Sequence, residues 1–165
     1  MKKISLIFGI LFSFTVTMIL PSCKTEVALT NEQRVEAALD GFVARLVQNP
    51  PTTADISGRV KDYLQANRSF FYGSTVTLLD STGLATVSPY WYRAGSDLSF
   101  VDLAVDSAYH INEQSWLRAP IDGGRAIWTD PYFDAGGGEI MMKTRSVPVF
   151  VNGKIIAVAT TDLAL

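Results

Sequence analysis

Six side chains in this 165-residue chain have the chemistry needed to recognise a small polar molecule. A pocket for such a molecule needs aromatic or apolar walls and a few polar groups that converge on it. Three aromatic residues could form the walls and attract an ammonium group. One aspartate stands near the end of an apolar run, where a carboxylate is costly without a partner. Two arginines could each hold a carboxylate through two hydrogen bonds. The six residues are Trp116, Trp128, Tyr132, Asp162, Arg93 and Arg118.

Several of these residues also have a structural interpretation. Trp128 and Tyr132 could pack in the core beneath a loop. Asp162 could cap the first helix or accept a hydrogen bond from a loop amide. Lys143 and Arg145 share one side of an expected strand, because side chains alternate along a strand, and we expect this charged pair to be solvated. The residue types alone leave these alternatives open.

The motifs of the common enzyme classes are missing from the sequence. There is no Gly-x-Ser-x-Gly turn for a serine nucleophile. The glycine run at 136–138 is not followed by the Lys-Ser or Lys-Thr of a phosphate loop. With His110 as the one histidine, a transition-metal site is not expected, and the acidic residues around the glycine run lack the spacing of a calcium hand. The sequence therefore predicts no catalytic residues, no metal and no cofactor.

The N-terminus has the pattern of an export signal. Met1 is followed by two lysines, and residues 4–20 carry no charge. Residues 20–23, Leu-Pro-Ser-Cys, resemble a bacterial lipobox, which implies that Cys23 is lipidated after removal of a signal peptide at 1–22. The alternative is an incidental thiol after an ordinary cleavage site. We expect an exported protein anchored in the cell envelope through a tether at 23–29, on the periplasmic side of the outer membrane if the host is Gram-negative.

The remaining residues read as one α+β domain. The net charge of −2, without a basic patch, argues against a nucleic-acid partner. Helices are expected first and strands later, and Asn152-Gly153 is a strong hairpin signal, so the sheet should be antiparallel. The expected helices cover residues 30–48 and 52–67, with short ones at 98–108 and 113–117; the expected strands cover residues 74–79, 84–92, 126–128, 139–151 and 154–163.

The C-terminal third resembles a Cache domain, an extracytoplasmic sensor module with a PAS-like fold. The resemblance rests on an ordered series of segments: Trp116 to Pro120, Trp128 to Asp134, Gly136 to Glu139, Met142 to Val149 and Gly153 to Leu163. It implies a single module over residues 30–165, with an antiparallel sheet of five or six strands and a long N-terminal helix packed on one face. It also implies a pocket for a carboxylate, an amine or a similar solute.

The resemblance includes one departure that bears on the ligand. Amino-acid-binding relatives have an arginine two residues before the motif tryptophan and a tyrosine just after it, whereas this chain has Gln114 and Leu117 around Trp116. The side chains that usually bind an α-carboxylate are therefore absent, so we do not predict an α-amino acid ligand. The resemblance implies that Asp162 meets the amine of a ligand.

Two functions follow from the sequence. The first is a lipid-anchored, extracytoplasmic small-molecule sensor without an output domain of its own, since no such domain follows Leu165. The second is a non-catalytic envelope protein that has lost its pocket and regulates a membrane signalling partner. The second predicts that Trp116 and Tyr132 close the cavity.

Overall fold

The computed structural model describes residues 28–67 and 71–165. The signal peptide expected at 1–22, the lipidation of Cys23 and most of the tether at 23–29 lie outside these residues. Within them, no helix combines the length and apolarity needed to cross a bilayer.

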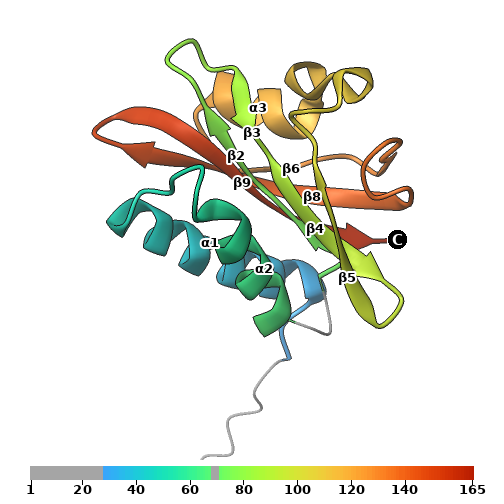
Figure 1. Cartoon of the computed structure of the whole chain (residues 1–165). Coiled ribbons are helices and arrows are strands. Elements are labelled where there is room, and N and C mark those ends of the chain that lie inside the picture. Colours follow the sequence, from blue (N-terminus) through green and yellow to red (C-terminus); the bar gives the residue numbers. More distant parts are fainter. Residues whose placement is uncertain (1–27, 68–70) are drawn as a thin grey trace, which may run out of the picture.

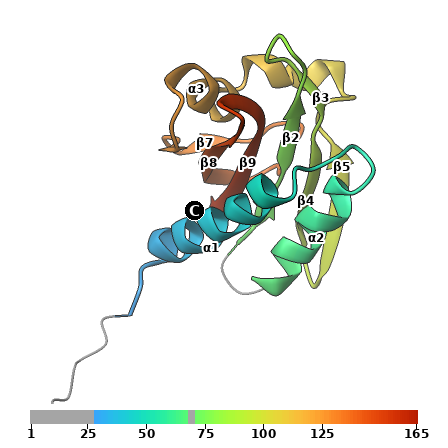
Figure 2. The same ribbon diagram turned by 90° about the vertical axis from the view of Figure 1, so that its left-hand side faces the viewer.

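Two N-terminal helices lie on one face of the sheet, as Figures 1 and 2 show. Helix α1 spans Asn31–Gln48 and begins with the predicted capping box, in which Thr30 and Gln33 satisfy each other's backbone amides. Helix α2 spans Ile56–Ala66, a few residues shorter than predicted. Apolar residues at helical spacing line the buried stripe of each helix, which is why both helices pack flat against the sheet.

Nine strand segments form one antiparallel sheet. In three places two short segments follow each other along the same neighbouring line of the sheet and so occupy one strand position. These pairs are β1 with β2, β3 with β4, and β6 with β7. The sheet therefore follows six lines, in the order β5, β3/β4, β1/β2, β9, β8, β6/β7, which confirms the expected α+β class. The segments are β1 Gly73–Ser74, β2 Val76–Leu79, β3 Ala85–Val87, β4 Pro89–Ala94, β5 Asp97–Asp102, β6 Ile127–Trp128, β7 Tyr132–Phe133, β8 Met141–Val151 and β9 Lys154–Ala164.

The long hairpin β8–β9 sits in the middle of the structure. Its turn is Asn152-Gly153, and both residues have the positive φ of a type I′ turn, 51° and 76°. The strands start in the register that this turn dictates. A bulge follows, because Phe150 pairs with Ile155 but Val149 pairs with Ala157, which leaves Ile156 as an extra residue.

The two faces of the sheet carry separate apolar clusters. The helix-side cluster packs α1 and α2 against residues such as Val147, Val149 and Ala157. The opposite face is covered by two short 3-10 helices, η1 (Ser107–Tyr109) and η2 (Ile111–Glu113), and by α3 (Ser115–Gly123). The cluster there includes Tyr90, Trp116 and Val158. This second face holds the candidate site.

Two predictions about local structure are wrong. The helix expected at 98–108 is instead strand β5 followed by η1, because Gly95, with φ 66°, turns the chain so that β5 pairs with β4 along its whole length. The pair Lys143 and Arg145 was expected to be solvated. Instead, Lys143 contacts Glu32, and the Arg145 guanidinium lies 4.0 Å from the Glu36 carboxylate. Helix α1 lies over that side of β8, which the strand pattern by itself did not indicate.

Candidate ligand-binding site

A small hollow lies between the sheet and the segment that contains η1 and α3. Its volume is about 10 Å³, which is room for about one water molecule. Strands β4, β8 and β9 supply its floor, and η1, α3 and the loop after β7 close over it. The residues that line it are Thr75, Tyr90, Leu103, Tyr109, Trp116, Tyr132, Asp134, Thr144, Thr160 and Asp162.

Asp162 is the central polar group of this hollow. It lies on β9, directly opposite Thr144 of β8, and is 4% exposed. The Thr144 hydroxyl donates a hydrogen bond of 2.7 Å to its carboxylate. Burial and the negative charge of Asp134 together raise the pKa of Asp162 to about 7, although the hydroxyls of Thr144 and Tyr90 act in the opposite direction. Near neutral pH this carboxyl is therefore poised between its protonated and ionised forms.

Asp134 is the second buried carboxylate of the hollow. The Tyr109 hydroxyl donates to it at 2.8 Å, and the amide of Gly138 donates at 2.6 Å. Burial raises its pKa, although the two donated hydrogen bonds act in the opposite direction. Asp134 also holds the glycine loop closed, because its own carbonyl accepts the amides of Gly137 and Glu139.

Four aromatic rings surround the two carboxylates. The Trp116 indole donates to the Tyr109 hydroxyl at 3.2 Å, and the Tyr132 hydroxyl and the Thr144 hydroxyl lie 2.8 Å apart. Burial raises the pKa of Tyr109 and of Tyr132, so both phenols stay neutral. The fourth ring is that of Tyr90, whose buried hydroxyl lies close enough to Asp162 to lower the pKa of that carboxyl but makes no well-aligned hydrogen bond within the described residues.

The charge of the hollow is one-sided. No lysine, arginine or histidine is among the residues that line it. Two carboxylates are thus buried near one another without a cation from the described part of the chain. Such an arrangement favours a positively charged or proton-donating guest, because a buried carboxylate without a partner is costly.

The structure brings together three of the six residues selected from the sequence. Trp116, Tyr132 and Asp162 all line the hollow. Asp162 therefore does not cap the first helix, and the Tyr132 hydroxyl points into a polar network. That the three residues bind a ligand remains a proposal.

The other three selected residues lie away from the hollow, so we do not include them in the site. Trp128 packs with the helix-side cluster and donates to Glu36 at 2.9 Å. Arg93 also faces the helices and donates to the backbone carbonyls of Phe71, Leu64 and Asn67. Arg118 bonds the carbonyl of Gly83 and pairs with Asp122 on its own helix.

Sequence reasoning missed seven of the ten residues that line the hollow, among them Tyr90, Tyr109, Asp134 and Thr144. Tyr109 sits in a 3-10 turn that has no periodic pattern. Asp134 stands in the glycine loop and was considered only as a calcium ligand. Strand alternation offered a signal for Thr144, which faces away from Lys143 and Arg145.

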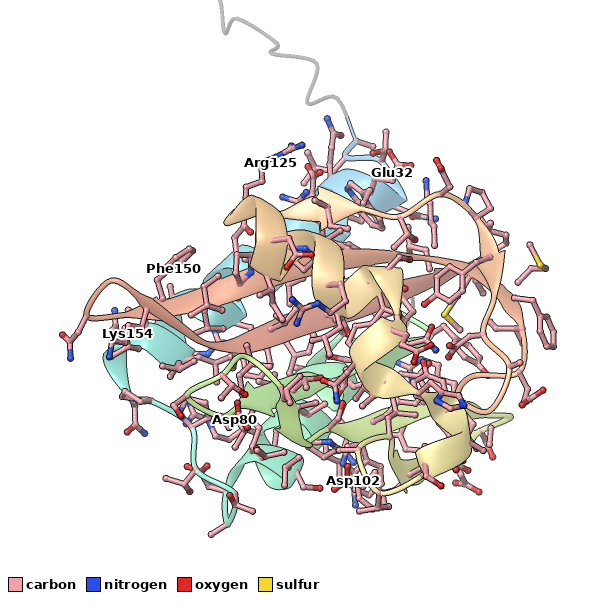
Figure 3. All side chains as sticks on the ribbon, turned by 90° about the horizontal axis from the view of Figure 1, so that it is seen from above. Glu32, Asp80, Asp102, Arg125, Phe150 and Lys154 are labelled. Atoms are coloured by element: carbon pink, nitrogen blue, oxygen red, sulfur yellow. The ribbon has the colours of Figure 1, made fainter. Side chains whose placement is uncertain are left out.

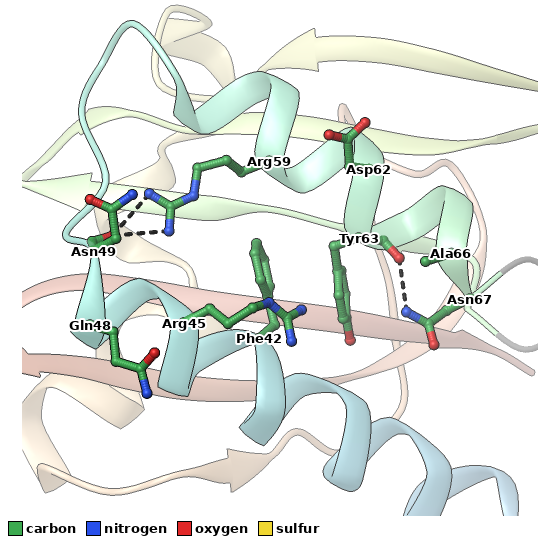
Figure 4. Close-up of a pocket in the computed structure, with 9 residues that line it drawn as sticks. All are labelled: Phe42, Arg45, Gln48, Asn49, Arg59, Asp62, Tyr63, Ala66 and Asn67. Atoms are coloured by element: carbon green, nitrogen blue, oxygen red, sulfur yellow. Dashed lines mark hydrogen bonds between the residues drawn. The ribbon is translucent and has the colours of Figure 1, made fainter.

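A larger groove of about 590 Å³ lies between α1 and α2, on the other side of the sheet (Figure 4). The rings of Phe42 and Tyr63 stack beneath it with centroids 4.5 Å apart, and the side chain of Arg45 lies over Phe42. Phe42 and Tyr63 are only 3% and 4% exposed. Arg59, which also lines the groove, already donates to the Asn49 carbonyl and pairs with Asp55. The small hollow, where charges are buried, is the better candidate despite its size.

A family model described as the first PDC sensor domain of methyl-accepting chemotaxis protein-like receptors matches residues 56–165. No significant match is found among curated proteins.

Solved structures of sensor domains have the same fold. The extracellular domain of soHK1S-Z6, a protein classed as a histidine kinase, is 28% identical with a TM-score of 0.68, and the match covers 81% of this chain and 53% of that one. The ligand-binding domain of the Pseudomonas aeruginosa amino acid chemoreceptor PctC, in complex with GABA, is 18% identical with a TM-score of 0.57, covering 81% and 57%. That of the Campylobacter jejuni chemoreceptor Tlp3, in complex with L-valine, is 15% identical with a TM-score of 0.60, covering 81% and 52%. The chain thus spans about half the length of these domains.

Proposed function

Because the chain belongs to the family of first PDC sensor domains of methyl-accepting chemotaxis protein-like receptors, we propose that it is a lipid-anchored extracytoplasmic sensor for a small organic cation. Its relatives are ligand-binding sensor domains, and their extracellular location implies that this chain is exported. The proposal adds three finer statements: the charge class of the ligand, the lipid anchor at Cys23, and the absence of a catalytic role.

The pair of buried carboxylates is the observation that supports a cationic ligand. Asp162 and Asp134 face a hollow to which the described residues contribute no basic side chain. An ammonium group there would replace the missing countercharge and convert the buried Asp162 to its ionised form. The rings of Trp116 and Tyr132 would add a cation–π attraction of about 0.5–2 kcal/mol. Within residues 28–67 and 71–165 no arginine lines the hollow to bind a ligand carboxylate, which argues for an amine without one.

Binding requires the hollow to expand, since about 10 Å³ does not hold an organic amine. The glycine loop is the segment best suited to move. It is held by the Asp134 carboxylate through the amide of Gly138, and by the Tyr72 hydroxyl, which donates to the Gly138 carbonyl at 2.7 Å. An ammonium that engages Asp134 would compete for the first of these contacts.

A melting screen tests the cationic ligand. Methylated and unmethylated amines should stabilise the protein by about 2.7 kcal/mol at 100 times Kd, or about 10 °C for a domain of this size. Matched alcohols and carboxylates should give no shift. Asp162→Asn should abolish the amine shift, whereas Asp97→Asn, at an exposed carboxylate in the β4–β5 hairpin, should keep it. An amine set without any shift would contradict the proposal.

The lipid anchor is tested separately. The full chain, expressed in a bacterial host with a fatty acid that carries a clickable tag, should be labelled and should fractionate with membranes. Cys23→Ala should lose both the label and the membrane association. Labelling that survives this substitution would refute lipidation at Cys23.

The small volume of the hollow favours a second candidate function. Trp116 and Tyr132 close the cavity almost completely, as expected for an envelope protein that regulates a membrane partner without binding a solute. This alternative predicts no stabilisation by any amine or carboxylate. It also predicts a stable complex with a membrane signalling protein, recovered by crosslinking in the envelope and lost when surface residues are substituted.

A further inference from the structure

An exposed apolar row crosses three neighbouring strands at one end of the sheet. Phe133 of β7 pairs with Met141 of β8, and the amide of Leu165, just after β9, donates to the Met141 carbonyl at 3.0 Å. Paired residues share a face, so the three side chains form a continuous row. They are 53%, 46% and 65% exposed. Single exposed apolar residues are ordinary, but a contiguous row indicates a contact surface.

The row lies at the end of the domain where α1 begins. Lys143 stands two residues after Met141 on the same side of β8, about 7 Å along the strand, and it contacts Glu32 in the first turn of α1. Arg145 and Glu36 meet one step further on, so α1 and β8 run in the same direction. The start of α1 and the apolar row are therefore neighbours.

The tether limits how far this end can lie from a membrane. Six residues lie between Cys23 and the helix cap Thr30, so the two are seven Cα–Cα steps apart. A fully extended chain of that length reaches at most about 25 Å. The far end of β8, which carries Phe150, lies about 30 Å further along the strand.

We infer that the row of Phe133, Met141 and Leu165 rests on the surface of the lipid bilayer. The inference depends on the proposed anchor at Cys23, because the short tether is what holds this end of the domain close to the lipid. The row would act as the second membrane contact that a lipid anchor is usually combined with. It would also fix the orientation of the sensor, with the β8–β9 turn pointing away from the membrane.

Depth-dependent fluorescence quenching tests this contact in the full, lipidated chain. The protein carries Met141→Cys labelled with bimane, and Cys23 is blocked by its lipid. It is reconstituted into vesicles of phosphatidylethanolamine and phosphatidylglycerol that contain nitroxide lipids. We expect nitroxides near the headgroups to quench the label, because an interfacial apolar contact lies about 5–10 Å into the headgroup boundary. A label at Phe150→Cys is the matched control, on the same strand, and should not be quenched.

A double substitution, Phe133→Ser with Met141→Ser, provides the second readout. It should leave vesicle flotation and the melting temperature unchanged, because the anchor and the core are untouched. It should remove the quenching of a label at Leu165→Cys.

Flotation without quenching at Met141→Cys would overturn the membrane contact and leave the anchor intact. Loss of flotation in the unsubstituted protein would refute the anchor and this inference together. Shielding of the label by self-association without lipid would assign the row to a second copy of the chain.

Discussion

Replacing Asp162 with asparagine should change how the stability of the domain depends on pH. In the folded protein burial raises the pKa of this carboxyl from 3.8 to about 7. Between these two values the folded state keeps a proton that the unfolded state has released, so the free energy of unfolding falls as the pH rises. One pKa unit corresponds to about 1.4 kcal/mol. The wild-type protein should therefore lose about 2–3 kcal/mol between pH 5 and pH 7 through this group.

Asparagine removes this dependence and keeps the contact. Its side-chain oxygen can still accept the hydrogen bond from the Thr144 hydroxyl, and it carries no charge to desolvate. The stability of Asp162→Asn relative to wild type should therefore increase as the pH rises toward 7, and the difference should level off above that value. Asp134 is present in both proteins, but its charge raises the pKa of Asp162, so the comparison reports the two interacting carboxyls together.

Urea unfolding followed by tryptophan fluorescence at a series of pH values measures the effect. Asp97→Asn serves as the control, because its carboxylate is exposed and the substitution should leave the pH profile parallel to that of wild type. If the profile of Asp162→Asn is also parallel to that of wild type within about 0.5 kcal/mol, the carboxyl of Asp162 is not buried as the structure describes. The reasoning about the charge of the hollow would then fail.

Three further substitutions test the packing, each by urea unfolding. Gly138→Ala should destabilise the domain by about 1–3 kcal/mol, because its Cβ would lie 2.4 Å from the Met142 methyl group; an unchanged midpoint would show that the glycine loop has room to move. Tyr63→Phe should cost about 1–2 kcal/mol, since it removes the buried 2.8 Å hydrogen bond with Thr161; no loss would mean that the bond contributes nothing net. Thr30→Ala should cost about 1 kcal/mol by removing the α1 cap, whereas Thr30→Ser should restore most of it.

Local signals were sufficient for the elements with strong patterns. The capping box fixed the start of α1, and Asn152-Gly153 fixed the β8–β9 turn. Residues 98–108 were misassigned because their apolar residues fit a helical spacing as well as an edge strand. What decides the structure there is the turn at Gly95 and the pairing of β5 with β4 in a hairpin, which the apolar spacing alone does not reveal.

The site was only half predictable for a related reason. The sequence indicated aromatic rings and a carboxylate, but not which face of the sheet each would occupy. Trp128 and Arg93 belong to the same segments as site residues, yet they point toward α1 and α2. The position of Asp134 could not be predicted, because it lies in a loop whose conformation depends on a hydrogen bond from Tyr109, a residue 25 positions earlier.

The acidity of the hollow depends on the bulge in the β8–β9 hairpin. Counting outward from the two-residue turn would place Asp162 opposite Lys143, where a cross-strand ion pair would neutralise the carboxylate. The extra residue Ile156 shifts the register by one, so Asp162 faces the Thr144 hydroxyl and Lys143 turns to Glu32 of α1. A one-residue shift exchanges the faces of a strand. The same shift therefore supplies α1 with its cationic partners and leaves the pocket with an uncompensated carboxylate, which is the feature that a cationic ligand would use.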